Sequence, residues 1–97
     1  MISGHSLTDY EFPGWQSSGR DYGVVRAREG EHKILVEIAP EYAEDLGRLM
    51  NPSAIELNRA LYQHHIYFIA EIERRYRSGQ FVEEQRDGSV FRIVRVT

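Results

Sequence analysis

The chain contains no cysteine, which excludes disulfide bonds, thiolate metal sites and cysteine nucleophiles. It also lacks long apolar runs: stretches such as Ile34 to Val36 are far too short to span a membrane. The N-terminus has no basic region followed by an apolar core, as a secretory signal would have. These absences predict a cytoplasmic protein that makes no membrane contact.

Lysine is almost missing as well, because every cationic side chain except Lys33 is an arginine. The guanidinium group is a planar fork of donors that suits phosphate and carboxylate, although codon bias in a GC-rich genome explains the same composition. The net charge is −3 and acidic residues are interleaved throughout. No run of like charge therefore marks a nucleic-acid-binding tail or an acidic DNA-mimicking surface.

What is present is the composition of one folded domain. Of the 97 residues, 41% are hydrophobic and 28% are charged. A chain of this length buries roughly 60 to 65% of its unfolded surface without needing a disulfide or a structural metal. We expect a single α+β domain covering residues 1–97, with residues 1–9 flexible.

Aromatic residues gather near the N-terminus, where Tyr10, Phe12 and Trp15 surround the turn signal Pro13-Gly14. This much aromatic area is unfavourable in water without a reason. One interpretation is a short strand or arm packed on the sheet. The other is an exposed aromatic surface that contacts a partner.

Alternation of apolar and polar residues from Tyr22 to Ile38 predicts a β-hairpin. With Glu29-Gly30 as a two-residue turn, Val25 lies opposite Ile34. A longer loop would shift this register. The side chains expected on the buried face are Val25, Ala27, Ile34, Val36 and Ile38.

Two helices are expected in the middle of the chain. Pro40 suits the first position of the first helix, and Ser53 with Glu56 has the spacing of a capping box for the second. The second helix should run to about Ser78, and Gly79 is a natural left-handed stop. Its apolar stripe at helical spacing contains Leu57, Leu61, Phe68, Ile72 and Tyr76, with Tyr62 and Ile69 on its flank.

Two adjacent histidines, His64 and His65, raise the question of a metal or catalytic site. Neighbouring residues on a helix diverge by about 100°, so the two rings cannot ligate one ion as histidines four apart do. A catalytic histidine needs an oriented partner and a nucleophile, and no such motif is present. We predict that His65 lies in the apolar stripe, in or at the rim of the core and hydrogen-bonded through one nitrogen, and that the protein is not an enzyme and needs no cofactor or metal.

A second hairpin follows around Asp87-Gly88, with Val82 opposite Ile93. The order ββααββ then predicts an α+β fold: an antiparallel sheet of about four strands with two helices packed on one face. Whether the two hairpins join within one monomer or complete a sheet across a homodimer is left open.

Several strings of the sequence resemble a family. They are FPGW, VVRAREGEHKILVEI, APEYAEDL, and ERRYRSG followed by DGSVFRI. Together they resemble a small bacterial family known as domain of unknown function 1488. The resemblance implies a compact α+β domain with no known activity or site. The chain departs from the family at Gln63-His64-His65, where a charged stretch containing arginine is usual, and in a longer segment from Phe81 to Asp87.

The function that best fits these features is a non-catalytic protein–protein interaction module, acting as a small regulator, adaptor or inhibitor; phage-encoded inhibitors of host defence have similar composition. Aromatic residues and arginine are enriched at binding hot spots. The candidate partner-binding residues are Tyr10, Trp15, Tyr67, Arg74, Arg75 and Arg77.

The alternative is a nucleic-acid-binding domain that uses an arginine-rich surface, with aromatic rings to stack on bases. Its cations would be Arg26, Arg28, Arg92 and Arg95 on strands, together with Arg74, Arg75 and Arg77 at a helix end. The acidic net charge counts against it. A hydrolase using His64 and Glu71 is the least favoured hypothesis.

Overall fold

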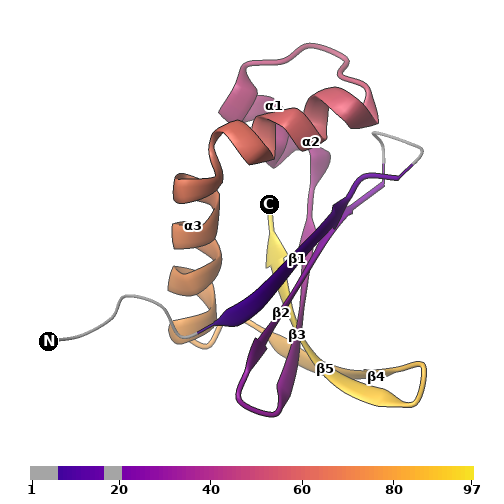
Figure 1. Ribbon diagram of the computed structural model, residues 1–97, viewed down its shortest axis with the longest axis vertical. Helices are drawn as coiled ribbons and strands as arrows, with labels where there is room; N and C mark the ends of the chain where they lie inside the picture. Colours follow the sequence, from indigo (N-terminus) through magenta and orange to yellow (C-terminus); the bar gives the residue numbers. More distant parts are fainter. Residues whose placement is uncertain (1–6, 17–20) are drawn as a thin grey trace, which may run out of the picture.

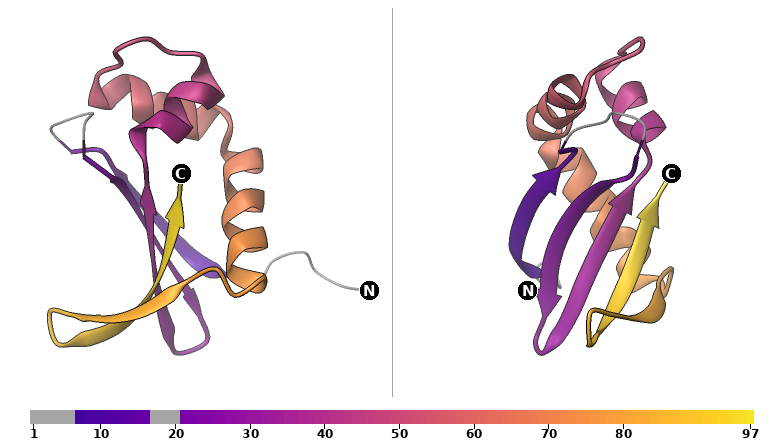
Figure 2. Two further views of the ribbon diagram at one scale, coloured as in Figure 1. Left: turned by 180° about the vertical axis from the view of Figure 1, so that it is seen from behind. Right: turned by 90° about the vertical axis from the view of Figure 1, so that its right-hand side faces the viewer.

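The computed structural model describes residues 7–16 and 21–97, and in them three helices pack on one face of a five-stranded sheet (Figures 1 and 2). The α+β class is confirmed. The predicted element order is wrong in detail, because there is an additional strand at the start and three helices instead of two. The elements are β1 (Thr8–Gly14), β2 (Gly23–Glu29), β3 (His32–Ile38), α1 (Pro40–Gly47), α2 (Ala54–Gln63), α3 (His65–Arg77), β4 (Val82–Arg86) and β5 (Ser89–Val96).

The sheet has the strand order β1-β2-β3-β5-β4 and is mixed rather than antiparallel. The two hairpins join within one monomer through β3 and β5, which run parallel with Leu35 opposite Ile93. The parallel pair arises because α1, α2 and α3 carry the chain across one face before β4 turns back into β5. All other strand pairs are antiparallel.

The first hairpin has its predicted buried face but a different register. Its turn is Gly30-Glu31, with Gly30 at φ 59°, which is the type II′ arrangement with glycine first. Val25 consequently lies opposite Val36, two residues from the predicted partner. A shift of two residues leaves every side chain on its original face, so the predicted core positions are all buried.

The second hairpin is confirmed in turn and register, with Val82 opposite Ile93. Asp87 and Gly88 both have positive φ, 51° and 78°, as a type I′ turn requires.

The segment expected to be flexible begins an edge strand instead. Leu7 is buried and β1 starts at Thr8, while residues 1–6 lie outside the described part. Two irregularities interrupt the pairing of β1 with β2, one on either side of Glu11. Such bulges bend an edge strand and weaken its tendency to pair with other chains.

The predicted long helix is broken into two. The capping box at Ser53 and Glu56 is present, and Gly79 has φ 82°, as expected for a left-handed stop. Between them α2 ends at Gln63 and α3 begins at His65, because His64 has φ −112° and ψ 29°. The two helices meet at a pronounced bend (Figure 1). No helix in the described residues is long and apolar enough to cross a membrane.

The bend also overturns the prediction that His65 belongs to the core. His65 is exposed. The helical projection placed it in the apolar stripe because it assumed one straight helix, whereas the chain bends at His64. The predicted single hydrogen bond is present: Nδ1 lies 3.0 Å from the carbonyl oxygen of Tyr62. The core instead closes over Leu61 before the bend and Phe68 after it.

Candidate functional site

Trp15 lies in the core, with only 3% of its surface exposed. Its Nε1–H donates to the carbonyl of Asp21 at 2.6 Å. Its backbone N–H donates to Asn58 Oδ1 at 2.8 Å, and Asn58 Nδ2 donates back to the Trp15 carbonyl at 2.9 Å. The N-terminal aromatic segment is therefore an arm packed on the fold, and Trp15 does not offer its ring to a partner.

A groove of about 520 Å³ opens where this arm passes the bend between α2 and α3. We call it the bend groove. Its inner part is apolar and includes Val25 of the sheet and Leu61 of α2. Asn58 also lines it, but both ends of its amide already bond the backbone of Trp15. The bend groove is lined by Phe12, Pro13, Gly14, Val25, Asn58, Leu61, Tyr62, His65 and Ile69.

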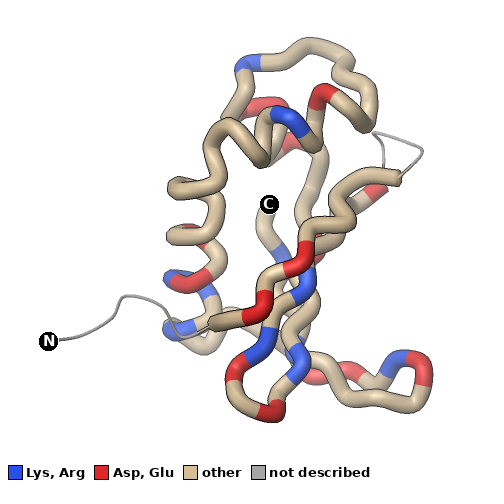
Figure 3. Tube along the Cα trace, viewed as in Figure 1, with Lys and Arg blue, Asp and Glu red and all other residues tan. Residues whose placement is uncertain are grey.

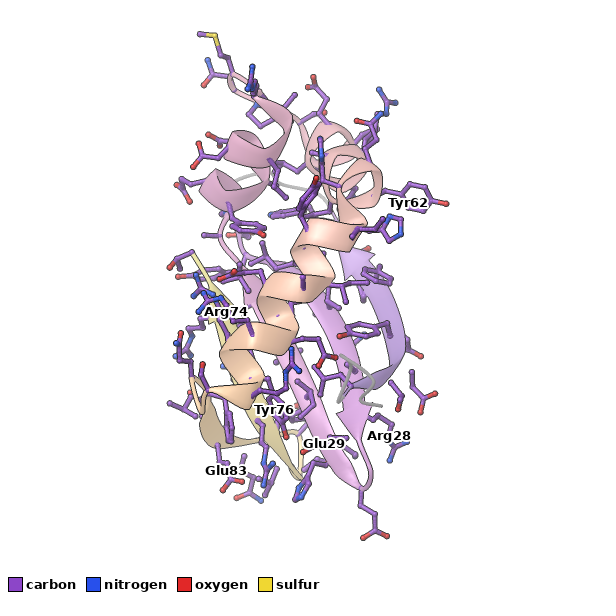
Figure 4. The ribbon with its side chains drawn as sticks, turned by 90° about the vertical axis from the view of Figure 1, so that its left-hand side faces the viewer. Arg28, Glu29, Tyr62, Arg74, Tyr76 and Glu83 are labelled. Carbon is purple, nitrogen blue, oxygen red and sulfur yellow. The ribbon has the colours of Figure 1, made fainter. Side chains whose placement is uncertain are left out.

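Three large side chains at the bend remain in water. Tyr62, Ile66 and Tyr67 are 82%, 72% and 71% exposed, and we call these three residues the bend patch. Of the three, only Tyr62 lines the groove. Tyr62 projects outward from α2 in Figure 4. The ring of His65 lies 6.3 Å from that of Tyr62. Tyr67 is thus on the surface, away from the core.

Tyr10 is half-buried, and its hydroxyl group makes a contact within the fold. Its hydroxyl donates to Glu73 Oε2 at 3.1 Å, and burial together with the Glu73 carboxylate raises the pKa of Tyr10 well above its ordinary value. Its ring stacks on Phe12 at 5.9 Å. Phe12 is the exposed member of this pair and lines the bend groove, although the sequence analysis did not select it.

The arginines at the end of α3 bind groups of the protein itself. Arg74 and Arg75 both donate to Glu71, which holds the pKa of that carboxyl below its usual value. Arg75 also donates to the carbonyl of Arg95 at 2.9 Å and so ties α3 to β5. Arg77 donates to the backbone carbonyl of Glu73 at 3.4 Å. Of the two arginines that bind Glu71, Arg74 is the more exposed, with 59% of its side chain in solvent against 19% for Arg75.

The strand arginines are divided between the two faces of the sheet. Arg92 donates to the hydroxyl of Tyr76 of α3 at 2.7 Å. Tyr76 in turn donates to Glu29 at 2.6 Å, and both of these residues are labelled in Figure 4. Arg95 lies on the opposite face and pairs with Glu37 at 3.1 Å. The positive charges in Figure 3 are correspondingly interleaved with negative ones.

Within residues 7–16 and 21–97, no group of three or more histidine, cysteine, aspartate or glutamate side chains is placed to hold a metal ion. Comparison of the chain with models of known protein families, with curated proteins and with solved structures finds no match. The resemblance to domain of unknown function 1488 therefore stays a prediction.

Proposed function

We propose that the protein is a non-catalytic interaction module that binds a partner protein through the bend groove and the bend patch. The observation that carries this proposal is the exposure of Tyr62, Ile66 and Tyr67 at the bend, together with an apolar groove that Tyr62 lines. A module of this kind acts as a regulator, an adaptor or an inhibitor of the protein that it binds.

The composition of the bend supports an interface. The six residues from Tyr62 to Tyr67, YQHHIY, contain no Asp, Glu, Lys or Arg, in a chain in which 28% of residues are charged. Interface centres are depleted of charge and enriched in tyrosine. This is also the stretch that departs from the charged pattern of the resembled family. An uncharged, tyrosine-bearing bend suits contact with another protein.

The groove supplies the second part of an interface, a place for an anchor. Its volume lies in the range of pockets that receive a small ligand or a few side chains. Because the amide of Asn58 is already bonded, the remaining walls favour an apolar side chain. We expect the partner to insert a leucine or an aromatic residue beside Phe12 and Ile69, and to cover Tyr62 with the surrounding surface.

Nucleic-acid binding is less well supported. Arg74, Arg75, Arg92 and Arg95 each form an ion pair with a carboxylate, and they lie on different faces of the fold. Breaking these pairs would offset much of the gain from binding phosphates. These four arginines therefore do not form a continuous cationic surface for a nucleic-acid strand.

An affinity-purification experiment tests the proposal. Tagged wild-type chain and the double variant Tyr62→Ala/Tyr67→Ala are used to capture proteins from lysate with and without nuclease treatment, and the captured proteins are quantified by mass spectrometry. The matched control is Val90→Ala, which removes an exposed apolar side chain from the β4–β5 hairpin. We expect a protein recovered by wild type and control but reduced about tenfold or more with the double variant, because hot-spot residues contribute this much.

Equal recovery with all three chains would contradict the role of the bend. Loss of every captured protein after nuclease treatment would instead support the nucleic-acid alternative.

A further inference from the structure

Like charges face each other on the side of the sheet away from the helices. Arg28 of β2 lies directly opposite Lys33 of β3, and Arg26 precedes Arg28 by two residues on the same face. In the described part of the chain none of the three forms an ion pair with a carboxylate. Like charges directly opposite each other destabilise a sheet. Within the described residues no ion pair with a carboxylate offsets this repulsion, although Glu11 of β1 lies opposite Arg26 in the sheet.

The other two arginines on this face of the sheet do have carboxylate partners. On the same face, Arg86 and Arg95 both pair with Glu37, at 3.0 and 3.1 Å. They also pair with Glu84, at 3.1 and 3.3 Å. One end of the face is thus neutralised by ion pairs between its own residues, while the three cations nearest the β2–β3 turn have no such pairs in the described part of the chain.

A hollow of about 650 Å³ lies over the three cations. Lys33 is held in place there, because its Nζ donates to Ser89 Oγ at 3.0 Å and lies 5.8 Å from the centre of the Phe91 ring. Asp9 and Glu11 of β1 line the other side of the hollow. The hollow therefore combines three cations, one aromatic ring and a negative rim.

We propose that this hollow binds a small phosphate monoester. Its phosphate group carries close to two negative charges at neutral pH, which offsets the repulsion between Arg28 and Lys33 better than a single carboxylate does. Phe91 offers an apolar surface for the organic part of the ligand. Asp9 and Glu11 oppose a long polyanion, because a nucleic-acid backbone leaving the hollow on that side meets two carboxylates.

The site is distinct from the bend groove, which lies between β1 and the helices, and the proposal is independent of the proposed function. It is tested by titrating the isotope-labelled full chain with phenyl phosphate and following its amide resonances by NMR. Inorganic phosphate, benzoate and phenol are titrated in parallel at constant ionic strength. We expect saturable shifts centred on Arg28, Lys33 and Phe91 with both phosphates, tighter binding of the ester, and weaker binding of benzoate.

The variant Arg28→Gln should weaken phenyl phosphate binding about tenfold or more, because it removes a charge-assisted hydrogen bond. Arg59→Gln, which changes an exposed arginine on α2, is the matched control and should bind as wild type does. Linear, non-saturating shifts with wild type, or equal binding by both variants, would overturn the proposal. Benzoate binding as tight as phenyl phosphate would overturn the assignment to a phosphate.

A second readout does not depend on the ligand. In low salt and without phosphate, Arg28→Gln should raise the Tm by about 1 to 5 °C, because it removes the repulsion from Lys33. Added phosphate should raise the Tm of wild type more than that of the variant. An unchanged or lowered Tm of the variant would contradict the repulsion between Arg28 and Lys33 on which the proposal depends.

Discussion

The side chain of Asn58 binds the backbone of Trp15 at both ends, with Oδ1 accepting from the Trp15 N–H at 2.8 Å and Nδ2 donating to the Trp15 carbonyl at 2.9 Å. These two hydrogen bonds join the end of β1 to the first turns of α2. Since Phe12 and Pro13 form one wall of the bend groove and Leu61 forms another, the Asn58–Trp15 pair holds the two walls together.

Replacement of Asn58 by alanine should destabilise the fold and open the groove. It removes two hydrogen bonds and leaves polar backbone groups of the buried Trp15 without partners. We expect a loss of about 1 to 3 kcal/mol in the free energy of unfolding, measured by urea denaturation. The control is Gln63→Ala, an exposed position on the same helix, which should stay within about 0.5 kcal/mol of wild type. Equal stability of the two variants would show that the arm is held by packing alone.

The contact between Gly23 and Trp15 should be intolerant of added volume. A Cβ atom at Gly23 would lie 2.7 Å from Cε2 of the Trp15 ring, well inside van der Waals contact. Gly23→Ala should therefore cost about 1 to 3 kcal/mol of stability, because the ring must shift within a packed core. In a double-mutant cycle, Trp15→Leu should recover part of this loss. Strictly additive effects of the two substitutions would contradict the predicted clash.

The hydrogen bond from Tyr10 to Glu73 should make the stability of the fold vary with pH in the alkaline range. Burial and the neighbouring carboxylate raise the pKa of Tyr10 in the folded state above its unfolded value. The contribution of Tyr10 is therefore complete below about pH 10 and is lost as the pH rises toward its folded pKa. Tyr10→Phe should be less stable than wild type at about pH 8, and the difference should shrink by about pH 11.

The measurement for Tyr10 is the urea midpoint at each pH, with Tyr67→Phe as the control. Tyr67 is exposed on α3, so its hydroxyl should contribute little to stability at either pH. A constant difference between wild type and Tyr10→Phe across this range would contradict the coupling to Glu73.

The tyrosines of the bend patch should be dispensable for folding. Tyr62 and Tyr67 are mostly exposed, so the double variant Tyr62→Ala/Tyr67→Ala should unfold within about 1 kcal/mol of wild type. Thermal and urea denaturation would measure this. A large loss of stability would mean that the two rings serve the fold, and it would remove the main reason to assign them to a partner.

Local signals in the sequence were sufficient for several elements. Asp87-Gly88 fixed the second hairpin because both residues must adopt positive φ in a two-residue turn. At the first hairpin Gly30 alone was ambiguous, since it can occupy either turn position, and the predicted register was two residues off. Alternation still placed the correct side chains in the core, because a two-residue shift preserves the faces.

The candidate site was harder to predict because its parts are distant in the sequence. Phe12 comes from β1, Leu61 from α2 and Ile69 from α3, and the bend at His64 brings them together. No proline or glycine marks that bend, so helical spacing favoured one straight helix. The exposure of Tyr67 follows from helical spacing alone. The burial of Trp15 could not be predicted, because aromatic content does not distinguish a buried ring from an exposed one.

The most direct test of the proposed binding surface is site-specific photo-crosslinking in cells that produce the protein. A benzoylphenylalanine side chain is introduced by Tyr62→benzoylphenylalanine or Tyr67→benzoylphenylalanine, with Val90→benzoylphenylalanine as the control on the distant hairpin. We predict that irradiation joins the two bend variants to the same partner protein and does not join the control to it. Crosslinking of that protein from all three positions, or from Val90 alone, would contradict binding at the bend.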